Sequence, residues 1–126
     1  MVVAALAAWH DRHEAAAEAV MDVRALPAHA MLEAYSVLTR LPAGLAVPAP
    51  EAAAVLEERF DDAPLRLEAR QRKRLLRSLA DAGVHGGASY DALVGLEANA
   101  HGQTLLTLDE RAQQTYARLG VAYRPL

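Results

Sequence analysis

The chain has 126 residues, of which 53% are apolar and 23% are charged, and its net charge is −3. This length and composition are typical of one globular domain and exclude a disordered tail. The chain has no cysteine, which excludes disulfides and cysteine-bound zinc, and it has no apolar run of the about 18 residues that span a bilayer, so we expect a cytoplasmic protein without membrane contact.

The first half of the sequence predicts three helices, with the loop "RLPAGLAVPAPE" (40–51) leading into the third. The segments "DRHEAAAEAVMD" (11–22), "MLEAYSVLTRL" (31–41) and "APEAAAVLEERF" (49–60) have the residue content and spacing of helices, while "LPAHA" (26–30) is at best a brief strand. Helical spacing predicts a shared apolar face for Leu32, Tyr35, Leu38 and Leu41. Glu33 lies off that face.

The middle of the sequence carries its positive charge. "APLRLEA" (63–69) is a candidate short strand, and "EARQRKRLLRSLADAG" (68–83) predicts a helix that ends on Gly83. This helix is expected to turn Leu75, Leu76 and Leu79 inward. Its cations are either an ordinary solvated face or contacts to a phosphate backbone. The candidate RNA contacts are Arg70, Arg72, Lys73 and Arg74.

The last third alternates helices with strands. A helix (89–102), a strand (103–108), a second helix (109–120) and a last strand (121–126) are predicted, and Gly102 and Gly120 follow the two helices. Such alternation implies a mostly parallel sheet flanked by helices, in which ligands collect at the carboxyl ends of the strands. Asp109 occupies such an end.

Two other acids are candidates for the same cleft. Asp91 lies in the first turn of the helix before the strand, and Glu33 lies on the helix after "LPAHA". Clustered carboxylates repel one another unless a cation neutralises them, and Mg²⁺ or Mn²⁺ suits oxygen ligands. Each acid also has an ordinary explanation: Asp109 as a helix cap, Asp91 as a complement to the helix dipole, and Glu33 as an exposed glutamate.

Three motifs in this order resemble the PIN-domain ribonucleases, above all the VapC-type toxins of toxin–antitoxin pairs. They are "E-x-x-S-V-L-x-R" from Glu33, "S-Y-D-A-L-V" around Asp91 and "L-L-T-L-D-x-R-A" through Asp109. The resemblance implies a single domain over 1–126 with a three-layer PIN-like α/β sandwich. It also implies that Glu33, Asp91 and Asp109 bind Mg²⁺ or Mn²⁺ and that Thr107 orients the site.

The same resemblance implies a function and partners. The implied function is metal-dependent endoribonuclease activity as the toxin of a type II toxin–antitoxin pair, with an RNA substrate, a small antitoxin protein and a homodimer. One family feature is missing, namely an initial strand that ends in Asp, so we expect an N-terminally shortened chain. This departure motivates an alternative: a catalytically impaired PIN-like module that binds and sequesters an antitoxin.

Overall fold

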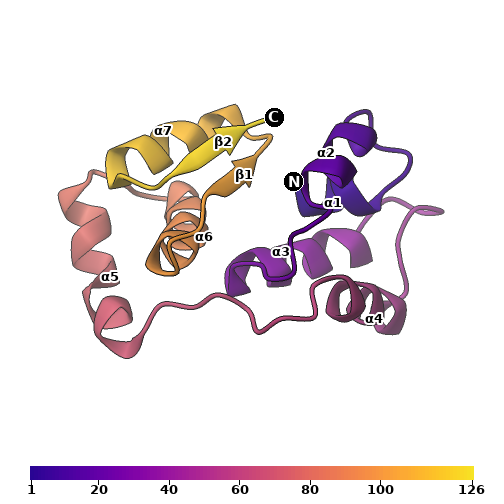
Figure 1. Cartoon of the computed structure of the whole chain (residues 1–126), viewed down its shortest axis with the longest axis horizontal. Coiled ribbons are helices and arrows are strands. Elements are labelled where there is room, and N and C mark those ends of the chain that lie inside the picture. Colours follow the sequence, from indigo (N-terminus) through magenta and orange to yellow (C-terminus); the bar gives the residue numbers. More distant parts are fainter. The chain divides into compact units, whose positions relative to one another are not determined.

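The computed structural model describes all residues 1–126 and divides them into two compact units, residues 1–64 and residues 65–126 (Figure 1). The first unit is helical, and the second combines helices with a parallel pair of strands. No helix in either unit is both long and apolar enough to cross a membrane.

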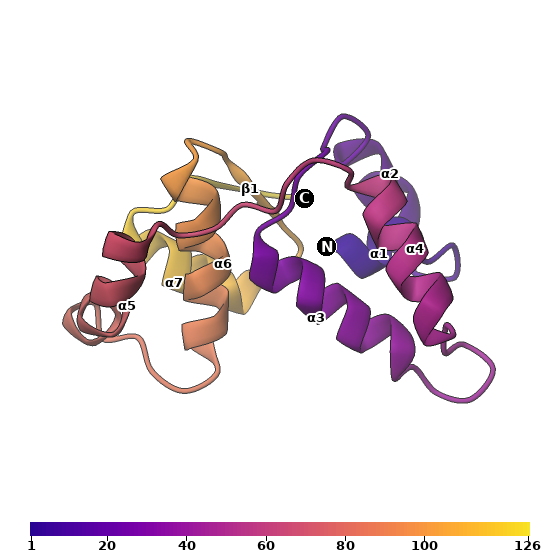
Figure 2. The ribbon, with the colours of Figure 1, turned by 90° about the horizontal axis from the view of Figure 1, so that it is seen from below.

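Four helices make up the first unit (Figure 2). Their bounds are α1 Val2–Leu6, α2 His13–Ala19, α3 Ala28–Thr39 and α4 Ala49–Arg59. α3 packs against α1 and α4, and α1 packs against α2. The three helices predicted from the first half of the sequence are therefore confirmed.

The core of the first unit lies between α3 and α4. Its buried members are Leu26, Ala34, Leu38, Ala52, Leu56 and Phe60. The apolar face predicted for α3 was partly wrong, because Leu32 is 62% exposed and Ala34 occupies the buried position instead. Glu33 is exposed, in agreement with its expected place off the buried face.

Neither of the two short strands predicted before residue 70 forms. α3 begins at Ala28 and takes up most of 26–30, because Ala favours helix and Pro27 starts the helix without needing a backbone donor. In 63–69 only Leu65 makes an isolated bridge, and Glu68 already caps the next helix. Each segment has one bridge residue, Pro27 and Leu65, in place of the predicted short strand.

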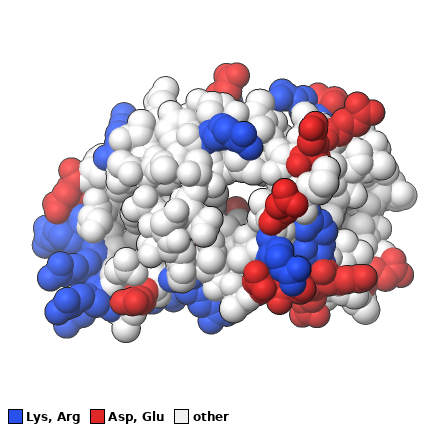
Figure 3. Space-filling view, viewed as in Figure 1, with Lys and Arg blue, Asp and Glu red and all other residues white.

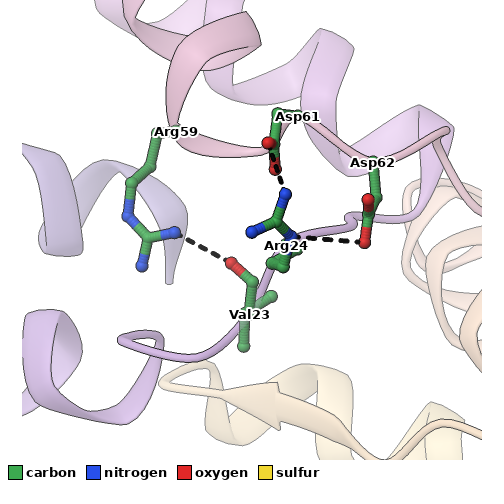
Figure 4. A network of polar contacts seen from close by, with 5 residues as sticks. All are labelled: Val23, Arg24, Arg59, Asp61 and Asp62. Atoms are coloured by element: carbon green, nitrogen blue, oxygen red, sulfur yellow. Dashed lines mark hydrogen bonds and ion pairs between the residues drawn. The ribbon is translucent and has the colours of Figure 1, made fainter.

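Two arginines fasten the segment after α2 to the end of α4 (Figure 4). Arg59, the last residue of α4, donates to the carbonyl of Val23 at 2.8 Å and to that of Met21 at 3.3 Å, and it also donates to the carbonyl of Val20. Arg24 pairs with Asp61 at 2.5 Å and with Asp62 at 3.6 Å. Arg59 thus donates to three carbonyls of the segment that follows α2, of which that of Val20 also accepts from Val23 N.

We expect Arg59→Met to lower the free energy of unfolding by about 2 kcal/mol, because charge-assisted hydrogen bonds to part-buried carbonyls are lost while the aliphatic stem is kept. Urea denaturation followed by circular dichroism measures this. Arg24→Met is the matched control, and its exposed ion pairs predict a loss of under about 1 kcal/mol. Equal losses in the two variants would contradict this assignment.

The second unit contains three helices and two strands. Their bounds are α5 Ala69–Asp81, α6 Ala88–Ala100, β1 Leu105–Thr107, α7 Glu110–Leu119 and β2 Tyr123–Pro125. β1 and β2 pair in parallel, with Leu105 opposite Tyr123 and Thr107 opposite Pro125. This confirms the predicted α/β class and the order of the last four elements, with a sheet of two strands.

α6 and α7 pack closely because α6 has a glycine at their contact. Tyr116 of α7 is buried and lies over Gly95, where an added Cβ would be 2.9 Å from Tyr116 Cδ1 and 3.2 Å from Val121 Cγ1. α7 ends at Gly120, whose φ of 65° is the left-handed conformation that a side chain would disfavour. The glycine at 95 therefore sets how near α7, and the Asp109 that starts it, can approach α6.

α5 is the most exposed helix of this unit. Leu79 is buried and Leu75 is partly buried, so these two residues fix the inward face as predicted. Leu76 is 79% exposed, and the prediction that it faces inward was wrong. Residue 76 is one position from Leu75 along a helix with 3.6 residues per turn, so it lies beyond the narrow buried stripe.

Candidate active site

Asp109 joins β1 to α7. It is the N-cap residue of α7, and its Oδ1 accepts hydrogen bonds from the backbone N–H groups of Arg111 at 2.8 Å and Ala112 at 3.3 Å. The capping explanation for this residue is therefore confirmed. Both hydrogen bonds use Oδ1, so Oδ2 of this exposed carboxylate is left to face solvent or a ligand.

Thr107 holds the backbone of Asp109 in place. Its side chain is 5% exposed, and its Oγ1 accepts a hydrogen bond from the Asp109 N–H at 3.0 Å. The backbone of Thr107 is meanwhile fixed in the sheet, where its carbonyl accepts from Leu126 N at 3.1 Å. The turn that presents Asp109 is thus anchored to the end of β1 through one hydroxyl.

We expect Thr107→Val to destabilise the second unit by about 1–2 kcal/mol. Valine keeps the shape of threonine, but it leaves the part-buried Asp109 N–H without its acceptor. The measurement is urea denaturation, with Thr107→Ser, which retains the hydroxyl, as the control. If valine and serine have equal effects, the hydroxyl does not anchor the turn.

Asp91 lies in the first turn of α6, as the sequence predicted, and its side chain is half-buried. A carboxylate in a first helical turn interacts favourably with the helix dipole, so its ordinary structural role holds here. α6 and α7 pack against one another within this unit, and α6 also contacts β1. Asp91 and Asp109 therefore belong to the same packed group of elements.

Glu97 is a buried acid that the sequence analysis did not single out. It lies on α6 and is 1% exposed, and no buried side-chain nitrogen or oxygen in the structure lacks a hydrogen-bond partner. The sequence of the helix around Glu97 could have indicated this burial. "ALVGLEANA" is apolar at most of its positions, which is typical of a helix buried around most of its circumference.

Glu33 belongs to the first unit. It is exposed on α3, and its Oε1 lies 3.3 Å from Nε2 of His29, one helical turn earlier. Within neither unit do three His, Asp or Glu side chains form a group that could hold a metal ion. That Glu33 shares a metal site with Asp91 and Asp109 therefore stays a prediction.

The cations predicted to contact RNA form a separate feature. Arg70, Arg72, Lys73 and Arg74 all lie on α5 and are exposed. Like charges three and four residues apart on a helix repel by about 0.2–0.5 kcal/mol per pair. The start of α5 is nevertheless stabilised, because Glu68 and Gln71 form a reciprocal capping box there.

His101 ties the segment before α5 to the end of α6. It is the C-cap residue of α6, and its Nε2 lies 3.0 Å from the carbonyl oxygen and 3.3 Å from the amide nitrogen of Arg66. In one tautomer Nε2 donates to the Arg66 carbonyl oxygen, and in the other it accepts from the Arg66 N–H. His101 therefore has a structural role at the end of α6.

The parallel strands, the flanking helices and the acid at the carboxyl end of β1 define an α/β protein of the kind that binds ligands at strand ends. A family model for the PIN domain matches residues 1–118, across both units. The chain belongs to the PIN domain family. The resemblance found from the three sequence motifs is confirmed.

Curated relatives are similar over nearly the whole chain. Ribonuclease VapC40 of Mycobacterium tuberculosis is 46% identical over 121 residues, which cover 96% of this chain and 90% of that protein. Ribonuclease VapC27 of the same organism is 47% identical over 118 residues, which cover 94% of this chain and 79% of that protein. No solved structure gives a significant match.

Proposed function

We propose that this chain is a metal-dependent endoribonuclease that acts as the toxin of a type II toxin–antitoxin pair. The proposal is carried by its 46% identity, over 96% of its length, to a protein named as a VapC ribonuclease. The placement of Asp109 at the end of β1, with one carboxylate oxygen to spare, supports the same activity. The substrate is RNA, and the reaction is hydrolysis of its phosphodiester bonds.

The acids of the candidate site suit a hard divalent cation. Oδ2 of Asp109 is an exposed anionic oxygen without a hydrogen bond, and oxygen is the donor that Mg²⁺ and Mn²⁺ prefer. Asp91 and Asp109 would hold the ion, and Glu33 joins them on the strength of its sequence motif. When bound, such an ion activates water and stabilises charge on a leaving oxygen.

In this proposal the residues of the chain orient the Asp109 carboxylate, and none of them acts as a nucleophile. Thr107 and the α7 amides fix the orientation of Asp109, so that its free oxygen points from a rigid turn. Holding a ligand group in one orientation before substrate arrives removes the cost of ordering it during reaction. Thr107 is thus a positioning residue in this proposal.

The proposal includes a small antitoxin protein as partner, a homodimer and a cytoplasmic location. The first follows from the relation to VapC ribonucleases. Size-exclusion chromatography with light scattering measures whether the purified chain is a dimer. Affinity purification of the chain from its native cells, with mass spectrometry of the small proteins that co-purify, tests the antitoxin.

The nuclease assignment is tested by incubating the purified chain with end-labelled structured RNA and Mg²⁺ or Mn²⁺. We expect internal cleavage that EDTA abolishes and that added Mn²⁺ restores. Cleavage that is unaffected by EDTA would contradict metal dependence. If the chain binds the antitoxin tightly and cleaves nothing with either metal, the alternative holds, namely a PIN-like module that sequesters its partner.

A further inference from the structure

Four cations share one side of α5. Arg70, Lys73, Arg74 and Arg77 are spaced by three and four residues, so they lie on one face of the helix, here called the basic face of α5. All four are exposed. Figure 3 shows Lys and Arg atoms gathered at the left, where α5 lies in Figure 1. Arg72 is also exposed but lies off this face.

The basic face has no carboxylate partner within the chain. None of its four side chains takes part in an ion pair or side-chain hydrogen bond, whereas Arg24 pairs with two aspartates. These cations are therefore available to a ligand without first breaking an internal contact. Their charge contrasts with the net charge of −3 of the whole chain.

The stability of α5 does not account for this arrangement. The N-cap Glu68 complements the dipole at the start of the helix, but the last turn has no basic residue, although the dipole favours cations there. Arg70 repels Arg74, and Lys73 repels Arg77, each across one helical turn. A polyanion bound along the face would relieve this repulsion.

We propose that the basic face of α5 binds the phosphate backbone of RNA, as a contact surface separate from the acidic candidate site. The proposal rests on the proposed function. Arg70 and Arg77 are about 10 Å apart along the helix axis, so the face meets several successive phosphates. α5 carries no aromatic residue for base stacking, so this contact gives affinity for RNA without sequence preference.

The experiment measures RNA binding without cleavage. The full chain carrying Asp109→Asn is titrated with fluorescent structured RNA in EDTA at several salt concentrations, with and without Arg70→Gln, Lys73→Gln, Arg74→Gln and Arg77→Gln together. We expect the fourfold variant to bind at least tenfold more weakly at low salt. The slope of log K against log salt should fall by about 3, since each lost phosphate contact removes about 0.7–0.9.

The matched control removes four exposed arginines elsewhere, as Arg12→Gln, Arg40→Gln, Arg118→Gln and Arg124→Gln, and reaches the same net charge. We expect its slope to change by less than about 1. Equal weakening by both fourfold variants would overturn the proposal, since net charge alone would explain it. Circular dichroism checks that each variant keeps the helix content of the original chain.

Two further outcomes are decisive. If the α5 variant keeps its RNA affinity but loses binding to a poly-glutamate probe, the face serves an acidic protein partner and the RNA proposal is wrong. Cleavage is measured separately with Asp109 intact and metal present. If the chain cleaves no RNA but its salt slope depends on the α5 cations, the nuclease proposal is wrong and the RNA contact is supported. If the chain cleaves RNA but its salt slope does not depend on the α5 cations, only the proposed contact is wrong.

Discussion

Asp109→Asn is expected to lower metal-dependent RNA cleavage by at least about 100-fold while leaving the free energy of unfolding within about 0.5 kcal/mol of the original. Asparagine keeps an oxygen that accepts from the Arg111 and Ala112 amides, so the cap of α7 survives. It loses the negative charge that a divalent cation needs. The measurements are the cleavage rate in Mn²⁺ and urea denaturation.

Asp109→Ala is the matched comparison. Alanine removes both the cap and the charge, so we expect the same loss of cleavage together with a destabilisation of about 1 kcal/mol. The pair of variants separates the two roles of one carboxylate. If Asp109→Asn cleaves RNA at the original rate, helix capping is the whole role of this residue and the proposed metal site is wrong.

Gly95→Val should destabilise the second unit by about 3 kcal/mol or more. Its Cβ alone would lie 2.9 Å from Tyr116 Cδ1 and 3.1 Å from Tyr116 Cε1, and its two methyl groups need further space. Tyr116 is buried and cannot move into solvent without losing its own packing. Urea denaturation measures the loss, and near-ultraviolet circular dichroism of the tyrosines reports whether the α6–α7 contact has loosened.

Ala100→Val is the control for the helix preference of valine, because residue 100 is exposed on the same helix. It should cost about 0.5 kcal/mol. Gly95→Ala lies between these extremes, since about 1 kcal/mol gained in helix propensity offsets part of the overlap. If Gly95→Val is no worse than Ala100→Val, the close approach of α7 to α6 is not tight.

The last four elements were predictable from sequence because local signals bound them. Gly102 and Gly120 have positive φ where α6 and α7 end, and Asp109 caps α7. The two failed strand predictions, at 26–30 and 63–69, had no such signals. A strand depends on a partner elsewhere in the chain, and alanine-rich segments next to proline satisfy their backbone more easily as helices or loops.

The candidate site likewise contains residues whose roles the sequence predicts and residues whose roles it does not. The cap by Asp109 followed from local chemistry, while the part played by Thr107 was implied only by the family resemblance, although its hydrogen bond to Asp109 N–H spans only two residues and is equally local. Glu97 was missed because a glutamate is ordinarily exposed, and its burial depends on how the rest of the fold surrounds α6. The relation of Glu33 to the other acids is a matter of tertiary structure and stays a prediction.

The capping role of Asp109 and its proposed role in ion binding place different demands on the residue at this position. A side chain one methylene longer, as in glutamate, keeps the charge but is not among the residues that N-cap positions prefer, and serine or asparagine satisfies those amides but carries no charge. Selection for folding alone would admit several residue types. Selection for folding and for the proposed ion binding together favours aspartate, so saturation mutagenesis at 109 would distinguish the two regimes.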